Sequence, residues 1–395
     1  MARPKAFVKS ATRPVVPEAS LTWEQVTAWR LRRQHLAERA PRKDMLRVAS
    51  DICGLHAQVT SSAELTLWAR VEGVTRSHVS DVLWKKRALV KTWAMRGTLH
   101  MFTATTFPVW LAAQRTRLPY YRRLSWLRYF GFSKPVELDR LIDAVGSALA
   151  DQELTREELI AAVGRVTRSK KLAETLRGSW GSALKPAAFA GNLCFAPSTG
   201  QNVRFTNPQT WLGGLDTVDP EEALSTITRA FLSAYGPETR EGFARWWGTT
   251  PSDALRMIRS LGDDAVAVDV EGEYAWAPAR DVAHMEKAQP TKTVNLLPAF
   301  DQYVVGVTKH AERLMPGPHK DLVYRAQGWL SPVLAVDGRM LGTWRHERKG
   351  RRLLVSFQPF VKIPARVRRH AEVEAESLAA FLGGVLEIDW ATPLA

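Results

Sequence analysis

The clearest hairpin in the sequence is Ala265-Val266-Ala267-Val268-Asp269-Val270, followed after Glu271-Gly272-Glu273 by Tyr274-Ala275-Trp276-Ala277. Apolar residues alternate in both runs, which is typical of half-buried β-strands, and the glycine between them favours a tight hairpin. Three helices are expected just before it, at residues 220–235, 239–247 and 252–261. Helices followed by a two-stranded wing are the order of a winged-helix module.

The same order of elements occurs twice earlier in the chain. The first copy has helices expected from about residues 22, 43 and 77, then strands at 90–93 and 98–102. The second has helices expected at 136–149, from 155 and at 173–189, then strands at 193–196 and 203–206. We therefore expect three tandem winged-helix modules that form a C-shaped arc. Their predicted bounds are 20–130, 131–215 and 216–290.

Short polar residues mark where several of these helices should begin. Thr22 and Thr155 are followed three residues later by Gln25 and Glu158, which is the pattern of a capping box. The other expected N-caps are Thr239, Ser77 and Ser252.

The last hundred residues have a different pattern. We expect an apolar strand at 294–300, a hairpin that turns at Asp337-Gly338, a further strand at 353–357 and a helix from Pro364 to about Leu382. Residues 291–395 therefore predict a small α/β subdomain. The fold class of the whole chain is α+β and mainly helical.

The charge of the chain favours a polyanionic partner. It has 395 residues, with 55 Lys and Arg against 40 Asp and Glu, a net charge of +15. Each basic side chain placed against a phosphate releases a condensed counterion, so nucleic acid is the first candidate. Cys53 and Cys194 are the only cysteines, too few for a disulfide framework and without zinc or iron–sulfur spacing. They indicate a reducing, cytoplasmic setting.

The N-terminus predicts neither a signal peptide nor a membrane anchor. Residues 1–19 carry Arg3, Lys5, Lys9 and Arg13 among prolines, and we expect a disordered basic arm there. No apolar run is long enough for a transmembrane helix. The sequence favours a monomer without membrane contact.

Two polar side chains, His56 and Gln58, stand one residue apart in Gly54-Leu55-His56-Ala57-Gln58, at the end of a predicted helix. A hydrolytic enzyme could hold one water between such groups. A histidine with a nearby glutamine at a helix end is more often a satisfied, half-buried hydrogen-bonding pair. The local sequence leaves both interpretations open.

A second cluster of interest is basic. Five cations and one acid occupy residues 345–352, at the expected tip of a hairpin; the cations are Arg345, Arg348, Lys349, Arg351 and Arg352. Such a tip could contact phosphates or could be charged only for solubility. Arg96, between the two strands of the first wing, could approach DNA or pair with a helix acid. The 15 tryptophans mostly have helical spacing among apolar neighbours, which favours core packing over base stacking.

From Leu21 to about Trp390 the chain resembles the AlkZ/YcaQ family of winged-helix DNA glycosylases. The resemblance rests on the stretches Leu55-His56-Ala57-Gln58, Met95-Arg96-Gly97-Thr98-Leu99-His100, Leu296-Leu297-Pro298-Ala299-Phe300-Asp301-Gln302-Tyr303 and Val336-Asp337-Gly338-Arg339 through Gly342-Thr343-Trp344-Arg345. It implies that His56 and Gln58 are catalytic. The family usually has Gln at the first of these positions, and His56 resembles a His-x-Gln subgroup linked to bulky, intercalating adducts.

The resemblance also implies a reaction. A monofunctional glycosylase would excise alkylated purines such as N7-alkylguanine from double-stranded DNA by water attack at C1′, without a cofactor, and leave an abasic site. The expectation extends to interstrand crosslinks and to either general repair or self-resistance in a nucleoid-associated protein. The resemblance would place the basic hairpin in the DNA minor groove, where it faces His56 and Gln58 across a channel. Arg96 would lie near that channel.

Other function classes fit the sequence less well. The sequence contains no phosphate-binding Gly-Lys-Ser loop, no H-E-x-x-H, no G-x-S-x-G and no dinucleotide fingerprint. The main alternative is a non-enzymatic winged-helix transcription regulator, which predicts a recognition helix rich in Arg, Asn and Gln. The third helix of the first module offers His78, Ser80, Lys85 and Lys86, which suit phosphate better than base edges.

Overall fold

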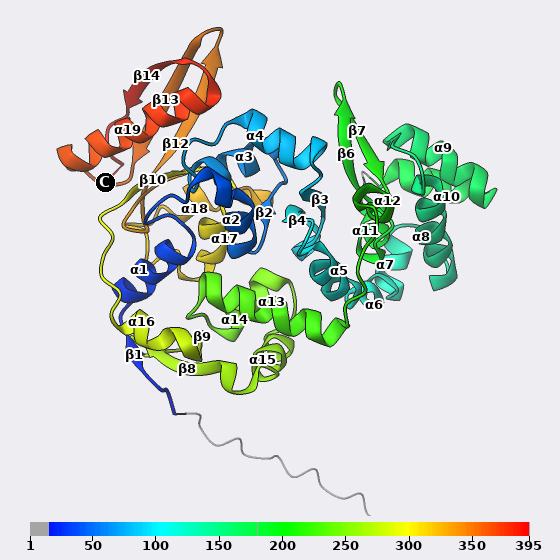
Figure 1. Cartoon of the computed structure of the whole chain (residues 1–395), viewed down its shortest axis with the longest axis horizontal. Helices are drawn as coiled ribbons and strands as arrows, with labels where there is room; N and C mark the ends of the chain where they lie inside the picture. The colour runs from blue at the N-terminus through cyan, green and yellow to red at the C-terminus, as the bar shows by residue number, and fades with distance from the viewer. Residues whose placement is uncertain (1–15, 180, 395) are drawn as a thin grey trace, which may run out of the picture.

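The computed structural model describes residues 16–179 and 181–394. The fold is mixed α+β, and about half of the chain is helical. Among the described residues the strands form three three-stranded sheets and one five-stranded sheet. The hairpins β6–β7 and β12–β13 project on the same side of the molecule, whereas β8 and β9 lie at the opposite end (Figure 1).

The first part of the chain carries a small sheet of order β2-β4-β3. Its strands are β2 (Leu55–His56), β3 (Leu89–Trp93) and β4 (Leu99–Thr103). Its helices are α1 (Trp23–Arg33), α2 (Met45–Asp51), α3 (Thr60–Trp68) and α4 (Arg76–Ser80), which a π-helical turn extends to Lys85. The strands at 90–93 and 98–102 are confirmed within one residue, while α3 and β2 were not predicted.

The second part is mostly helical. Its helices are α5 (Phe107–Arg115), α6 (Leu118–Tyr121), α7 (Leu124–Tyr129), α8 (Pro135–Leu149), α9 (Arg156–Thr167), α10 (Lys170–Gly178), α11 (Lys185–Ala190) and α12 (Pro208–Leu212). Its sheet has the order β5-β7-β6, with β5 (Leu154–Thr155), β6 (Cys194–Thr199) and β7 (Asn202–Thr206). The prediction of a single helix at 173–189 is wrong, because two separate helices, α10 and α11, occupy this region.

The third part contains the hairpin of alternating apolar residues at 265–277. Its elements are α13 (Pro220–Tyr235), α14 (Arg240–Trp247), α15 (Pro251–Arg259), β8 (Ala265–Val270), β9 (Glu273–Pro278) and α16 (Val282–Glu286). The hairpin is confirmed. Its third strand is β1 (Ser20–Leu21), which pairs parallel to β8. The start of the chain therefore lies in this sheet, although the sequence assigned it to the first module.

Part of the predicted basic arm is also held by this sheet. The backbone N–H of Glu18 donates to the carbonyl of Ala267 at 2.8 Å, and Ala19 is buried. The prediction of a disordered arm is therefore wrong for these residues, because backbone hydrogen bonding extends beyond β1. Residues 1–15 of the arm lie outside the described residues.

The C-terminal part forms the five-stranded sheet, in the order β10-β11-β12-β13-β14. Its strands are β10 (Val294–Leu297), β11 (Val333–Val336), β12 (Arg339–Lys349), β13 (Arg352–Pro359) and β14 (Val385–Trp390). Its helices are α17 (Gln302–Gly306), α18 (Lys320–Val323) and α19 (Ala365–Leu382). The turn at Asp337-Gly338 is confirmed. Its two residues have φ of 47° and 76°, and positive φ at both positions gives a two-residue turn whose twist matches that of the flanking strands.

The capping residues are those predicted at three helices and different at two. Thr22 and Thr155 make capping boxes with Gln25 and Glu158, and Thr239 caps α14. Helices α4 and α15 are capped by Thr75 and Thr250 in place of Ser77 and Ser252. In α15 the proline that follows Thr250 takes the first helical position, where an N–H would have no partner within the helix.

One hydrophobic core joins the first part of the chain to the C-terminal sheet. Buried residues that share this core include Leu55 and Met101 from the first part and Leu296, Val304 and Trp344 from the last. The strand that carries His56 is therefore built into the same core as the C-terminal subdomain. Residues about 240 positions apart in sequence define the surroundings of this histidine.

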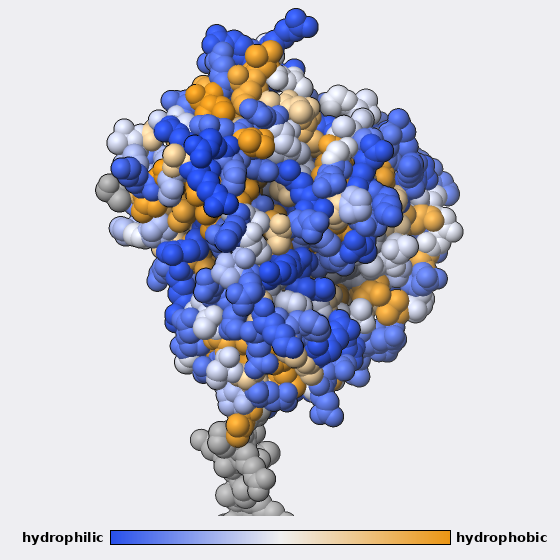
Figure 2. Space-filling model, turned by 60° about the vertical axis from the view of Figure 1, so that its left-hand side comes forward, coloured by the Kyte–Doolittle hydropathy of each residue, from blue (hydrophilic) through white to orange (hydrophobic). Residues whose placement is uncertain are grey.

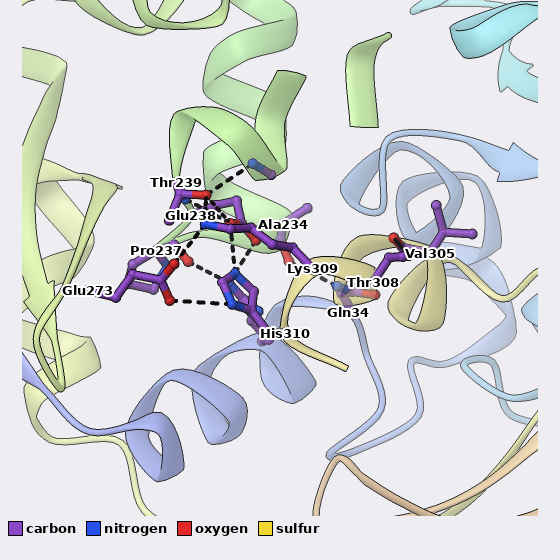
Figure 3. A network of polar contacts seen from close by, with 12 residues as sticks. Gln34, Ala234, Pro237, Glu238, Thr239, Glu273, Val305, Thr308, Lys309 and His310 are labelled. Atoms are coloured by element: carbon purple, nitrogen blue, oxygen red, sulfur yellow. Dashed lines mark hydrogen bonds and ion pairs between the residues drawn. The ribbon is translucent and has the colours of Figure 1, made fainter. Parts of the chain in front are cut away.

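A buried polar network fixes α1 against the third part. Glu238 accepts from Arg30 at 3.3 Å and contacts His310 Nε2 at 2.9 Å, and Lys309 Nζ lies 2.7 Å from Glu273 (Figure 3). Burial would raise the pKa of Glu238, but the hydrogen bond with His310 and the charge of Arg30 hold this pKa below its ordinary value. The network therefore keeps a fully buried carboxylate ionised between α1, α14 and the segment after α17.

A second buried ion pair anchors the C-terminal subdomain. The guanidinium of Arg70 holds both oxygens of Asp301 at 2.7 and 2.8 Å, and neither side chain is exposed. We predict that Arg70→Met lowers the free energy of unfolding by about 3 to 5 kcal/mol, since it leaves a buried carboxylate without its charge partner. Urea denaturation followed by circular dichroism measures this change.

Two further variants control that measurement. Arg70→Met combined with Asp301→Asn should regain much of the loss, because no uncompensated charge remains. Arg76→Met removes a surface ion pair with Glu64 and should change stability little. A single Arg70→Met variant as stable as the Arg76→Met variant would show that the buried pair does not anchor the subdomain.

Candidate active site

His56 lies on a short strand at the edge of a sheet. It is paired with His100 of β4, next to the Leu55–Met101 pair. The sequence placed His56 at the end of a helix, which is wrong: α2 ends at Asp51, and Cys53 and Gly54 turn the chain with φ of 62° and 87°. A Cβ at Gly54 would lie 2.6 Å from the Phe102 ring, so only glycine fits this turn.

The segment from Pro298 to Tyr303 covers one face of His56. The Phe300 ring stacks on the imidazole with centroids 5.0 Å apart and planes at 7°. Phe300 has φ of 59°, a left-handed conformation that costs energy for a bulky residue. Asp301, which caps α17 and pairs with Arg70, and Gln302, which donates to the carbonyl of Gly54, hold this conformation in place.

The imidazole of His56 is neutral at physiological pH. The side chain is 5% exposed, and burial, together with the positive charge of Arg96, lowers its pKa to about 3. Its Nδ1 has no hydrogen-bond partner among the described residues. His100 lies edge-on at 5.1 Å, and burial also lowers its pKa well below the ordinary value. A neutral imidazole keeps one nitrogen that can accept a hydrogen bond from a water molecule.

Gln58 lies on the solvent side of this buried ring. Its side chain is exposed, and its Oε1 accepts a long hydrogen bond of 3.4 Å from the backbone N–H of Leu99. The interpretation of His56 and Gln58 as a satisfied, half-buried pair does not describe them, because no contact joins the two side chains among the described hydrogen bonds. The buried imidazole and the exposed amide mark the boundary between the core and solvent.

Arg96 is held by a helix end and not by a carboxylate. It has φ of 57° in the turn between β3 and β4, and its guanidinium donates to the carbonyl of Trp246 at the end of α14. Arg117 donates likewise to the carbonyl of Trp247 at 2.5 Å. Two cations at a helix C-terminus complement its partial negative charge. The salt bridge to a helix acid that the sequence left open is therefore absent from this residue's described contacts.

A large cavity lies beside Arg96, away from the His56 motif. Its volume is about 890 Å³, and neither His56 nor Gln58 is among its lining residues. The cations that line it are Arg96, Arg117, Arg123, Lys185 and Arg256; Asp253 is the one lining acid. Arg256 already pairs with Asp253, so the cavity carries an excess of positive charge.

The predicted DNA-contacting cations project far from the core. Arg345, Arg348 and Lys349 lie on β12, not in a loop as expected, because the strand pairs with β13 as far as the Lys349–Arg352 position. All five cations are exposed, and hydrophilic residues cover the tip of the projection at the top of Figure 2. Arg352 makes a two-pronged ion pair with Glu387 of β14, so this residue also braces the hairpin.

Comparison with known proteins connects this geometry to a family. The model of the DNA glycosylase AlkZ-like family matches residues 49–381. The chain belongs to the AlkZ-like family of DNA glycosylases. An interstrand DNA cross-link repair glycosylase of Streptomyces sahachiroi is 35% identical over 328 residues, which are 82% of this chain and 87% of that protein.

A solved structure shares the fold. Streptomyces sahachiroi DNA glycosylase AlkZ matches with a TM-score of 0.84 and 34% identity, over 94% of this chain and all of that one. The AlkZ-like protein described here is therefore an enzyme, a hydrolase acting on N-glycosyl bonds of DNA in repair. The family sets aside the non-enzymatic regulator. Within the described part of the chain, no helix has both the length and the apolar character needed to cross a membrane.

The AlkZ-like chain uses residues that the sequence did not single out for this site. Phe300 and His100 contact the His56 ring, and Arg70 fixes the segment that carries Phe300. Phe300 and His100 were visible only as members of stretches that carry the family resemblance, and Arg70 lay outside those stretches. The motif from Leu296 to Tyr303 was the available signal, but nothing in the sequence indicated its contact with His56.

The pKa of His56 gives a pH prediction. Since burial holds this pKa near 3, the ring stays neutral from about pH 8 to about pH 5, and base release should be flat over that range. Activity that depends on the neutral ring should fall only as the pH approaches about 3 to 4. Single-turnover rates at saturating enzyme measure the profile. A fall in rate with a midpoint near 6.5 would instead indicate an ordinary, solvated histidine.

Proposed function

We propose that this AlkZ-like chain is a monofunctional glycosylase that releases N7-alkylguanine and related alkylated purines from duplex DNA by water attack at C1′. The observation that carries the proposal is a neutral His56, 5% exposed, that lies one residue from the exposed Gln58 at the boundary between core and solvent. His56 accepts a hydrogen bond from the attacking water, and the amide of Gln58 orients that water. The product is an abasic site.

The chemistry requires little from the enzyme beyond placement of this water. Alkylation at N7 makes the purine cationic, so the C1′–N9 bond breaks with its electrons moving onto the base and leaves oxocarbenium character on the sugar. Water bonded to C1′ at that stage is acidic, and a weakly basic imidazole suffices to take its proton and pass it to solvent. A charged imidazolium would repel the developing sugar cation, which the low pKa of His56 avoids.

The architecture supports a substrate whose damaged base does not enter an enclosed pocket. We interpret the three three-stranded sheets with their helices as tandem winged-helix modules arranged in an arc around DNA. The large cavity is lined by an excess of cations, which would repel a positively charged alkylated base. The relative from Streptomyces sahachiroi is named for interstrand cross-link repair, and a crosslinked or intercalated base would not fit a snug pocket. We therefore extend the proposed substrates to bulky adducts.

We predict that His56→Ala abolishes release of N7-methylguanine while duplex affinity stays within about twofold, because the buried ring contributes to the water and not to phosphate contacts. Gln58→Ala should lower the rate by a smaller factor, since it removes the orienting group only. High-performance liquid chromatography of released bases and electrophoretic mobility shifts measure the two quantities. His370→Ala, an exposed histidine on α19, is the matched control. Full activity of the His56→Ala variant would remove this residue from the mechanism.

The hairpin gives a separate prediction about binding. Changing Arg345, Lys349 and Arg351 together to Ala should weaken duplex binding and reduce its salt dependence by roughly 0.9 for each phosphate that is no longer neutralised. Fluorescence anisotropy at several salt concentrations measures the slope. The control changes Arg259, Arg280 and Lys287, exposed cations on and beside α15 and α16 at the other end of the molecule (Figure 1). Equal slopes for both triple variants would show that the hairpin is not a DNA contact.

A further inference from the structure

An exposed tryptophan contacts the aromatic stack of the candidate active site. Trp329 is 45% exposed, and its ring meets Phe300 edge-on at 4.9 Å. Phe300 in turn stacks on His56 at 5.0 Å. The rings of Trp329 and His56 therefore lie within about 10 Å of each other, with Phe300 in contact with both.

The loop that presents Trp329 is tightly built. The backbone N–H of Arg325 donates to the carbonyl of Trp329 at 2.9 Å, and Tyr324 and Leu330 form an isolated β-bridge at its base. Gln327 and Gly328 have φ of 60° and 78°. A left-handed, non-glycine residue in a closed turn costs energy, and such strain commonly marks a functional segment. Residues 325–329 are all exposed, so the turn does not serve to bury its own side chains.

Trp329 leaves a large part of its indole surface open to a ligand. An indole buries more apolar surface than most side chains, and single-stranded or unstacked bases are its common partners in nucleic-acid-binding proteins. Tryptophan is also the best aromatic partner for a cation. The rings beside it, Phe300 and the neutral His56, add no charge that would repel a cationic base.

We propose that Trp329 is a binding site for the alkylated purine itself, and that its indole face receives the cationic ring while the sugar lies toward His56 and Gln58. The inference rests on the proposed function and specifies how that site selects its substrate. A neutral purine gains stacking from the indole, whereas an N7-alkylated purine gains stacking and cation–π attraction. Trp329 therefore sets the preference for damaged over undamaged DNA.

The test measures binding and excision separately. The probes are a duplex with one N7-methylguanine, a duplex with its hydrolysis-resistant 2′-fluoro analogue, and the undamaged duplex. Trp329→Leu keeps an apolar side chain against Phe300 but removes the π face, and Trp329→Phe restores a weaker one. Trp329→Leu should lower the preference for the 2′-fluoro lesion over undamaged DNA roughly tenfold or more, with a parallel loss of excision. Trp329→Phe should recover part of both.

Controls separate this site from a structural role. Tyr129→Leu changes another exposed aromatic, 81% exposed on α7, and should leave the lesion preference unchanged. The pH profile of the residual activity should also stay unchanged in Trp329→Leu. The proposal is overturned if Trp329→Leu retains the wild-type lesion preference, or if it weakens damaged and undamaged duplexes by the same factor.

Failure of the proposed function gives a different result. A wild-type protein that prefers the 2′-fluoro lesion but releases no N7-methylguanine would contradict the hydrolytic assignment of His56 and leave the binding role of Trp329 supported. If the wild-type protein excises the base and the Trp329→Leu variant has the same excision rate and lesion preference, the hydrolytic function is supported and the binding role of Trp329 is contradicted.

Discussion

The buried ion pair between Arg70 and Asp301 is the interaction on which the candidate site depends. It joins the segment after α3 to the first turn of α17, and both side chains are fully buried. Burying two charges is expensive, so the pair is held by a two-pronged geometry and by further hydrogen bonds to the carbonyl of Thr66 and from the N–H of Tyr303. These contacts fix the strained Phe300 between them and the active-site strand.

The C-terminal subdomain therefore determines the burial and the protonation state of His56. Phe300 covers one face of His56, Gln302 holds the turn at Gly54, and the shared core buries most of the ring. Desolvation then keeps the imidazole neutral. Cations stand at the edges of the molecule, on the β12–β13 hairpin and around the cavity near Arg96, where phosphates would be met. Aromatic rings line the place where we propose that the cationic base binds.

Much of this arrangement was accessible from the sequence, for identifiable reasons. Strand alternation and turn residues predicted the β8–β9 hairpin and the Asp337-Gly338 turn, and capping boxes located α1 and α9. These features are local, because periodicity and caps depend on neighbours in the chain. The prediction that His56 ends a helix was wrong because Cys53 and Gly54 form a left-handed turn. The Phe102 ring packs so closely against Gly54 that only glycine fits there.

The features that sequence reasoning missed are long-range. The parallel pairing of β1 with β8, the Arg70–Asp301 pair and the stack of Phe300 on His56 each join residues more than 200 positions apart. No local pattern specifies such partners. The basic run at 345–352 was found from its composition, but its extension along β12 follows from pairing with β13, which adds a projecting arm that a loop of the same residues would lack.

The most direct test of the account is a structure of the His56→Ala variant bound to a duplex with a 2′-fluoro-N7-methylguanosine. The account predicts that C1′ of the lesion lies beside positions 56 and 58, within reach of one bridging water, with the alkylated base still outside the cationic cavity. A lesion base bound inside the cavity lined by Arg96, Arg117 and Lys185, with its sugar turned away from the His56 strand, would contradict it.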